Sequence, residues 1–220
     1  MVQKKKNAPQ PLPTAANEPK RRGRPRAYQP EVALGKALAL FRKDGFAGTS
    51  LDDLSAATGM NRPSLYGAFG DKRDLYIKSY GRYRADARAR MVDIFRDELP
   101  IRKRLARIYD VALDIYVGGE EGPRGCFTVM TAASEAIFDS EIRAMVLEGF
   151  FELDKAFANC FRLAKEQGEL PGGAEPAVLA QLASATIHTL AIRARAGVPR
   201  KELESIVKGA IDVMVGKAAK

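Results

Sequence analysis

Residues 49–72 read TSLDDLSAATGMNRPSLYGAFGDK and carry the start and stop signals of two short helices. Thr49 or Ser50 can cap the first helix, because a side-chain hydroxyl accepts a hydrogen bond from a free N–H group at a helix start. Asp52 and Asp53 follow in the first turn, where carboxylates interact favourably with the helix dipole. Gly59 then breaks the run, so the pattern predicts a helix over about 51–58.

A second helix follows with signals of its own. Asn61 is a good cap, and Pro63 is tolerated in a first turn, where its missing N–H would be unpaired anyway. Gly70 ends this run, which predicts a helix over 62–69. Two short helices joined by a three-residue turn have the geometry of a helix-turn-helix, whose second helix can enter a DNA major groove.

From residue 30 onward the rest of the chain also reads as helix, because apolar residues recur at helical spacing and alternating runs are scarce. Further helices are expected over 30–44, 71–98, 100–117, 124–137, 140–167, 176–196 and 200–216. We therefore expect an all-α protein in three parts: a disordered tail (1–28), a three-helix helix-turn-helix domain (29–75) and a larger helical domain (76–220).

The formal net charge of +9 lies mainly in the first 28 residues, which hold eight basic side chains and one acidic side chain. This tail is rich in proline and polar residues, so it lacks the apolar surface that offsets the entropy of ordering. Arg22, Arg24 and Arg26, separated by Gly23 and Pro25, resemble the core of an AT-hook. These arginines either enter an A·T-rich minor groove or add only charge-based affinity for phosphate.

The chain is poor in the side chains that most enzymes and metal sites use. It holds two cysteines and one histidine, too few for a disulfide framework, a thiolate zinc site or most histidine metal sites. We therefore expect no metal, no cofactor and no catalytic residues. The absence of an 18-residue uncharged apolar run and of a signal peptide predicts a cytoplasmic protein with no membrane partner.

Several short segments share one characteristic order and spacing: Gly45-Phe46, Thr49-Ser50, Asp53-Leu54-Ser55, Gly59-Met60 and the run from Ser64 to Lys72. Together they resemble the N-terminal domain of the tetracycline-repressor (TetR) family, over roughly residues 30–78. The sequence RGCF at residues 124–127 also resembles a segment of one branch of that family. The resemblance implies a homodimeric transcriptional repressor that binds a palindromic DNA operator and is released by a small-molecule effector. It also implies that residues 76–220 bind the effector and dimerise through the last helices.

Phosphate contacts are expected from three hydroxyl side chains and one lysine. Thr49 and Ser50 lie at a helix N-terminus that suits a phosphate, and capping alone is the other role open to them. Tyr66 stands where the family places a phosphate-contacting tyrosine, with packing between helices as the alternative. Lys72 begins the next helix and is expected to reach the DNA backbone, unless it is an exposed charge without a partner.

Base reading is expected from the outward face of residues 62–69. Arg62 is the candidate for a guanine edge, because a guanidinium can bond O6 and N7 together, and a phosphate contact is its alternative role. Ser64, Gly67 and Ala68 would make small or apolar contacts, including contacts with thymine methyl groups. Asp52 would repel a phosphate that it faced, and it is expected to face solvent.

The last two helices carry apolar residues at i, i+3 and i+4 spacing, and two such faces from each of two subunits can form a four-helix interface. Packing inside one subunit is the alternative. The residues expected at the dimer interface are Leu179, Leu182, Ala183, Thr186, Leu203, Ile206, Val207, Ala210 and Met214.

A mostly apolar effector pocket is expected between the helices of residues 101–190. Its expected lining is Tyr109, Leu113, Tyr116, Phe127, Met130, Ile137, Phe150, Phe151, Phe157 and His188, each with plain core packing as the alternative. Cys126 either is structural or, at a helix start after Arg124, senses redox state.

Two other functions remain open at this point. An architectural protein would bind DNA through the basic tail with little sequence preference. An all-α enzyme is the second alternative, and the shortage of catalytic side chains counts against it.

Overall fold

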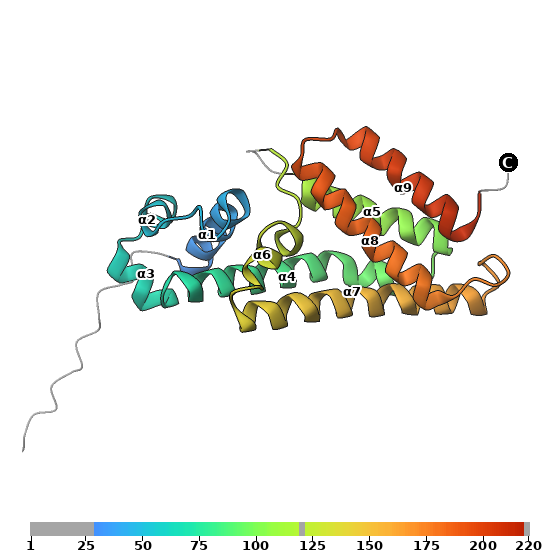
Figure 1. The fold of residues 1–220 in the computed structure, drawn as a ribbon, viewed down its shortest axis with the longest axis horizontal. Helices are drawn as coiled ribbons and strands as arrows, with labels where there is room; N and C mark the ends of the chain where they lie inside the picture. The colour runs from blue at the N-terminus through green and yellow to red at the C-terminus, as the bar shows by residue number, and fades with distance from the viewer. Residues whose placement is uncertain (1–28, 119–121, 218–220) are drawn as a thin grey trace, which may run out of the picture.

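The computed structural model describes residues 29–118 and 122–217, so the tail with Arg22, Arg24 and Arg26 lies outside the described residues. Within those ranges the chain is helical and has no strand, which confirms the all-α fold (Figure 1). The elements are α1 (Pro30–Asp44), α2 (Leu51–Thr58), α3 (Arg62–Phe69), α4 (Lys72–Arg96), α5 (Ile101–Val117), the π-helical turn η1 (Thr128–Ala132), α6 (Ala133–Glu135), α7 (Ser140–Glu166), α8 (Pro176–Arg195) and α9 (Arg200–Val215).

Helices α1, α2 and α3 form a small head around the start of α4. The buried stripe of α1 consists of Ala33, Ala37 and Phe41, at a spacing of four residues. Val32 of the same helix is more than half exposed, because it lies one position outside this stripe. The ring of Phe41 packs edge-on against Tyr76 of α4, with ring centroids 5.0 Å apart.

Helix α4 is shared by the head and the body. Asp71 caps it by accepting a hydrogen bond from the Asp74 N–H, and the Asp74 carboxylate bonds the Asp71 N–H in return. The helix then runs without a break for 25 residues, beside α7 for much of the body (Figure 1). Because α4 is one continuous helix, it constrains the motion of its first turns relative to the body.

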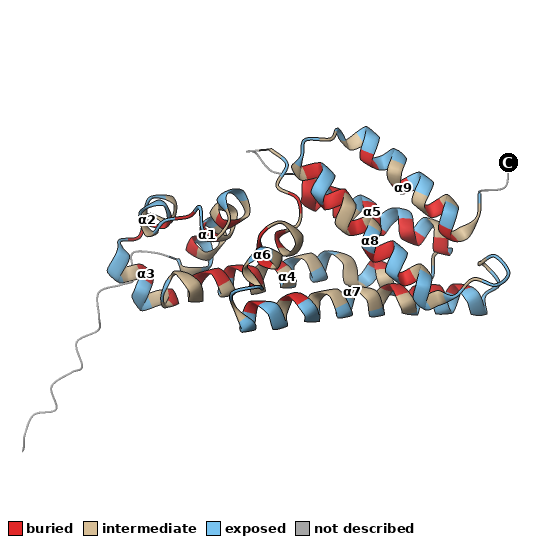
Figure 2. Cartoon of the chain, in the orientation of Figure 1, coloured by how far each residue is buried: buried red, intermediate tan, exposed pale blue. Residues whose placement is uncertain are grey.

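The body consists of α4 to α9. Helix α8 packs mainly on α7, and α9 packs on α5 and α8. Figure 2 shows the buried residues gathered on the helix sides that face one another. The central side chains are fully or almost fully buried: Leu105, Ile108, Tyr109, Phe157, Phe161 and Leu190. Burial of this apolar surface is the main stabilising contribution to the body.

The segment after residue 122 departs from the helix predicted over 124–137. The chain has no regular secondary structure through Cys126, and the N–H groups of Arg124 and Gly125 both donate to the Tyr116 carbonyl. Gly125 has a φ of +64°, and a Cβ there would lie 2.7 Å from the Ala191 carbonyl oxygen of α8. A regular helix cannot begin at this glycine because its left-handed conformation is needed to bring the backbone against α8.

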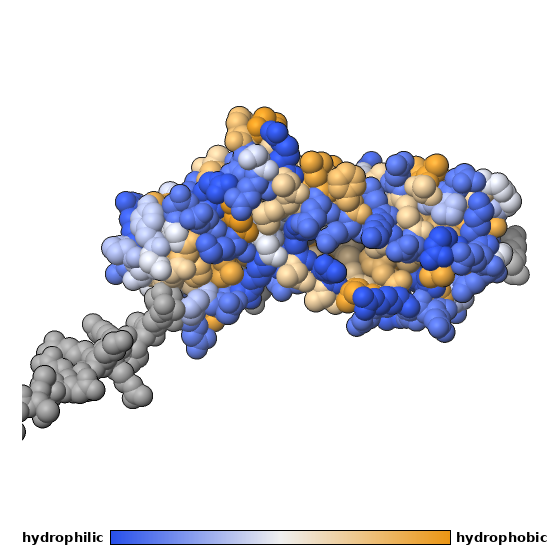
Figure 3. All heavy atoms as spheres, turned by 90° about the horizontal axis from the view of Figure 1, so that it is seen from below, coloured by the Kyte–Doolittle hydropathy of each residue, from blue (hydrophilic) through white to orange (hydrophobic). Residues whose placement is uncertain are grey.

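Helix α8 has the length and apolar composition of a membrane span, and 39% of that apolar window is buried inside the structure. It packs on α5, α7 and α9, as expected for a core helix of a helical domain. Seen from below, the surface of the molecule is largely hydrophilic and is interrupted by separate hydrophobic patches (Figure 3).

Candidate nucleic-acid interface

Helix α3 presents a polar and aromatic face to solvent. The Arg62 side chain is 54% exposed and Tyr66 is 46% exposed, whereas Leu65 and Phe69 are buried against the head. Gly67 has no neighbouring atom within 4 Å of the position of a Cβ. Asn61 caps the helix through a hydrogen bond from the Ser64 N–H to its side chain at 2.9 Å. The short, exposed and small-residue face of α3 has the shape that major-groove entry requires.

Arg62 is paired with a carboxylate of the preceding helix. Its Nε and Nη2 donate to Asp52 Oδ1 at 3.0 and 2.7 Å, and these hydrogen bonds raise the pKa of the Arg62 guanidinium. Asp52 is exposed, as expected, but it is not simply a solvent-facing charge. The pair connects the first turn of α2 with the first turn of α3.

The two hydroxyl residues before α2 have different environments. Thr49 is only 1% exposed, and its hydroxyl donates to the Gly45 carbonyl at 2.6 Å. A phosphate contact by the Thr49 side chain is therefore corrected to a structural role, because its hydroxyl proton is already used inside the head. Ser50 is exposed and accepts a hydrogen bond from the Asp53 N–H at 3.1 Å. The Ser50 hydroxyl and N–H in turn lower the pKa of Asp53.

Lys72 lies over the ring of Phe46, with its ammonium nitrogen 4.3 Å from the ring centroid. This cation–π contact positions the half-buried lysine at the N-terminal end of α4. Phe46 itself packs edge-on against Tyr76 at 5.1 Å, so the lysine rests on a side chain that belongs to the core between head and body.

Arginines join the end of α1 to the body. Arg195 of α8 donates to the carbonyls of Arg42 and Lys43, both at 2.6 Å. Arg42 donates from Nη2 to the carbonyls of Ile115 and Gly125 at 3.0 and 2.9 Å, and burial lowers the pKa of its guanidinium. The last carbonyls of α1, which have no partner within the helix, are thus satisfied by α8.

A second junction joins the start of α4 to the start of α7. Arg73 Nε donates to Asp139 Oδ2 at 2.5 Å, and Arg73 Nη2 donates to Glu141 Oε2 at 2.8 Å. Asp139 also caps α7 by accepting from the Glu141 and Ile142 N–H groups. The Arg73 guanidinium lowers the pKa of Asp139 to about 2.

The residues predicted to line an effector pocket lie in different environments in the body. Tyr109, Tyr116, Phe127 and Phe157 are buried core side chains, and Met130, Phe150 and His188 are half-buried. Leu113 is buried at the base of a surface groove between α5 and α9. Ile137 and Phe151 are 70% and 69% exposed, so their assignment to an internal pocket is wrong. An apolar side chain is buried only where another element covers it, and the residue type alone does not show where that happens.

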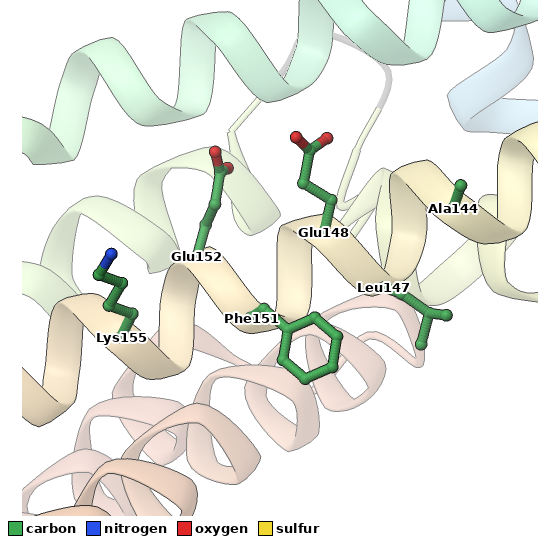
Figure 4. A pocket seen from close by; sticks show the side chains of 6 residues that line it. All are labelled: Ala144, Leu147, Glu148, Phe151, Glu152 and Lys155. Atoms are coloured by element: carbon green, nitrogen blue, oxygen red, sulfur yellow. The ribbon is translucent and has the colours of Figure 1, made fainter.

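Phe151 and Leu147 project from α7 beside a shallow surface hollow (Figure 4). Glu148 and Glu152 project on the other side of the same helix, toward α4, where Arg84 bonds both carboxylates at 2.7 and 3.0 Å. The charged face of α7 is thus paired with α4, and its apolar ridge remains uncovered.

Phe127 is instead the centre of an aromatic cluster that the sequence reasoning missed. Its ring centroid lies 5.3 Å from those of Tyr76 and Tyr80 and 5.7 Å from that of Tyr83. The Tyr76 and Tyr80 hydroxyls donate to the side chains of Thr131 and Thr128 in η1. Burial raises the pKa of Tyr80 to about 12. The spacing of the three tyrosines, on one face of α4, was the available signal.

The apolar residues of α8 and α9 divide into two groups. Ala183, Leu203, Val207 and Met214 are buried within the subunit, so their assignment to a dimer interface is corrected to the monomer core. Leu182 is exposed, and Leu179, Thr186, Ile206 and Ala210 are half-buried. Further exposed apolar residues on these helices are Val178, Ile192 and Val213.

The remaining ionisable side chains do not gather into a metal site. Within residues 29–118 and 122–217 there is no group of three His, Cys, Asp or Glu side chains able to hold a metal ion. Cys126 and Cys160 are free thiols, and burial raises the pKa of Cys160. Burial also lowers the pKa of His188, whose ring lies 5.0 Å from that of Phe150.

Known proteins match both parts of this arrangement. The profile of the bacterial regulatory proteins of the tetR family matches residues 33–78, and that of the tetracyclin repressor-like C-terminal domain matches residues 102–209. The HTH-type transcriptional repressor ComR of Escherichia coli (strain K12) is 27% identical over 85% of this chain and 89% of its own length. The repressor BdcR of the same organism is 34% identical over 49% of this chain and 54% of its own length.

Solved structures agree with these sequence matches. A cysteine mutant of the TetR family transcriptional regulator CifR, complexed with a 26 bp double-strand operator DNA, is 28% identical. It superposes with a TM-score of 0.76 over 87% of this chain and 100% of that chain. The helix-turn-helix head and the helical body therefore place this chain in the TetR family of ligand-responsive, DNA-binding transcriptional regulators.

Proposed function

We propose that the protein is a homodimeric repressor that binds an inverted-repeat operator through α3 and leaves it when a small molecule binds the body. The observation that carries this proposal is the pairing of an exposed reading face on α3 with an uncovered apolar face on α8 and α9. One helix-turn-helix has weak specificity, whereas two heads read half-sites separated by about one helical turn or a multiple of it.

On the DNA side, we assign base contacts to Arg62, Ser64, Gly67 and Ala68. Phosphate contacts are assigned to Ser50, Tyr66 and Lys72. The exposure of Arg62 and Tyr66 and the position of Lys72 at the start of α4 support these roles. Residues 1–28 would add affinity through their basic charge, and Arg22, Arg24 and Arg26 would lie along the flanking minor groove.

Dimerisation is assigned to the outer face of α8 and α9. Val213 lies in the last turn of α9 and is 79% exposed, a high value for an apolar side chain on an amphipathic helix. Gly209, in the same helix, has open space where its Cβ would be, although a mid-helix glycine costs about 1 kcal/mol relative to alanine. An uncovered glycine beside uncovered apolar side chains favours close approach by a second helix. The contact would also include Leu182, Thr186, Ile206 and Ala210.

Release is assigned to the contacts that join the body to the head. An effector changes DNA affinity only if it binds two arrangements of the protein with different affinities. Arg195 and Arg42 on one side, with Arg73 and Asp139 on the other, fix the head in the arrangement described above. Phe127 packs against the tyrosines of α4, and Arg42 lies over the ring of Tyr83, so repacking of the body around Phe127 would displace α4. We place this non-enzymatic regulator in the cytoplasm.

The test is selection of bound duplexes from a random library with the full-length chain, followed by footprinting. We expect an inverted repeat occupied by two chains, and reduced transcription from a promoter that carries it. Equal affinity for selected and random duplexes would instead indicate an architectural DNA-binding protein. Increased transcription would reverse the assigned sign of regulation.

A further inference from the structure

Arg62 and Asp52 form a side-chain pair across the two helices of the helix-turn-helix. The Asp52 carboxylate accepts from Nε and Nη2 of Arg62 through one oxygen, Oδ1, at 3.0 and 2.7 Å. Both side chains are more than half exposed, at 75% for Asp52 and 54% for Arg62. Exposed ion pairs contribute little to stability, and α2 and α3 are already joined by a three-residue turn. The pair is therefore not needed to hold the two helices together.

The pair leaves a defined part of the guanidinium free. A guanidinium has five N–H donors in a planar fork, and Asp52 engages the one on Nε and one on Nη2. The two donors of Nη1 and the second donor of Nη2 remain, and one donor of Nη1 is parallel to the free donor of Nη2 at the end of the fork. Two parallel donors on one edge match the O6 and N7 acceptors of guanine.

The charge of Asp52 acts in the same direction. A phosphate that approached Arg62 would also approach the adjacent carboxylate, and the repulsion would cancel much of the attraction. A guanine edge carries no formal charge, so it is not penalised in this way. The carboxylate thus distinguishes between the two roles that the sequence left open for Arg62.

From this geometry we infer that Asp52 is the specificity-determining partner of Arg62: it orients the guanidinium toward a guanine in the major groove and keeps it from the DNA backbone. The inference rests on the proposed function, because it needs α3 to lie in the groove. Asp52 is a positioning residue here, and Arg62 makes the base contact.

The experiment uses the full-length chain and the duplex selected from a random library by the wild-type protein. Dissociation constants are measured for this duplex and for duplexes in which each G·C pair of a half-site is replaced in turn. We expect one G·C position at which the wild type discriminates by about 5- to 150-fold. The Arg62→Ala variant should lose that discrimination. Asp52→Ala should also lose most of it while binding random duplexes more tightly and with a steeper salt dependence, because Arg62 is then free to bind phosphate.

Asp44→Ala is the matched control, because Asp44 is an exposed carboxylate of the same head at the end of α1. It removes the same charge and should leave base discrimination unchanged. Two results would overturn the inference alone: a recovered site at which Asp52→Ala retains the full discrimination, or a site at which Arg62→Ala weakens all duplexes equally. Failure to select any preferred duplex would overturn the proposed function, and this inference with it.

Discussion

Arg195 and Arg42 lie 153 positions apart in the chain, and the side chain of the first donates to the backbone carbonyl of the second at 2.6 Å. The same guanidinium reaches the Lys43 carbonyl, so the last turn of α8 caps the last turn of α1. The helix proposed for the dimer interface is thereby connected directly to the head. This contact is independent of α4, which provides the continuous connection.

Replacing Arg195 with Ala should loosen the head. The change leaves two α1 carbonyls without their charged donor, and we expect a loss of roughly 2 kcal/mol in the free energy of unfolding, since hydrogen bonds to charged groups contribute about 1.5–3 kcal/mol. Urea unfolding would give the loss, and hydrogen exchange would show faster opening of α1. Arg193→Ala is the control, because Arg193 is exposed and bonds only within α8, to Thr189, among the described contacts. Equal effects of the two variants would exclude a coupling role for Arg195.

Replacing Lys72 with Ala should weaken binding to every duplex. Loss of one phosphate contact lowers the slope of log K against log salt by about 0.9, so binding should be measured from low to moderate salt. Tyr66→Phe should weaken binding without changing the slope, because a hydroxyl carries no charge. Lys201→Ala is the control, because Lys201 is an exposed lysine of α9 in the body. An unchanged slope for Lys72→Ala would remove this lysine from the phosphate contacts.

Replacing Val213 with Glu should dissociate the dimer. The side chain is exposed in the subunit, so folding should be unaffected, whereas a carboxylate inside the proposed interface would lose its hydration. We expect the dimer dissociation constant to rise at least about tenfold by sedimentation equilibrium, which corresponds to about 1.4 kcal/mol. Val32→Glu places the same charge at an exposed position of α1 in the head and should leave the dimer intact. If both variants remain equally dimeric, the interface lies elsewhere.

The junction of Arg73 with Asp139 should weaken in acid. The pKa of Asp139 is lowered from 3.8 to about 2, so its stabilising contribution is complete above pH 3.8 and is lost as the pH falls toward 2. The Asp139→Asn variant lacks this charge but can still cap α7. The difference in unfolding free energy between wild type and variant should therefore be constant near pH 6 and shrink between about pH 4 and 2. A difference that does not change with pH would contradict this assignment.

Deleting residues 1–28 should lower operator affinity, because it removes eight basic side chains and one acidic side chain from a nearly neutral body. We expect the loss to be larger on A·T-rich flanks than on G·C-rich flanks, as measured by titration of matched duplexes. An equal loss of affinity on both kinds of flank would indicate that the tail contributes only charge-based affinity for phosphate. Unchanged affinity would exclude it from the interface.

Local signals in the sequence were sufficient for the head. Ser50 and Asn61 form the caps that their side chains predict, and Gly59 adopts a left-handed φ of +73° at the end of α2. These features depend on partners within four residues, so they can be predicted without knowledge of the rest of the fold.

Hydrogen bonds between near neighbours specify the two short helices of the helix-turn-helix and their caps, so these features follow from the sequence alone. Tertiary structure alone decided which apolar residues of α8 and α9 are core: Leu203 and Val213 are equally apolar, but only the first faces α5 and α8. It also decided that Arg62 pairs with Asp52, and that residues 122–126 are not helical. Each of these outcomes depends on atoms contributed by another helix or loop. The spacing of residues along one helix does not specify which other element packs against it.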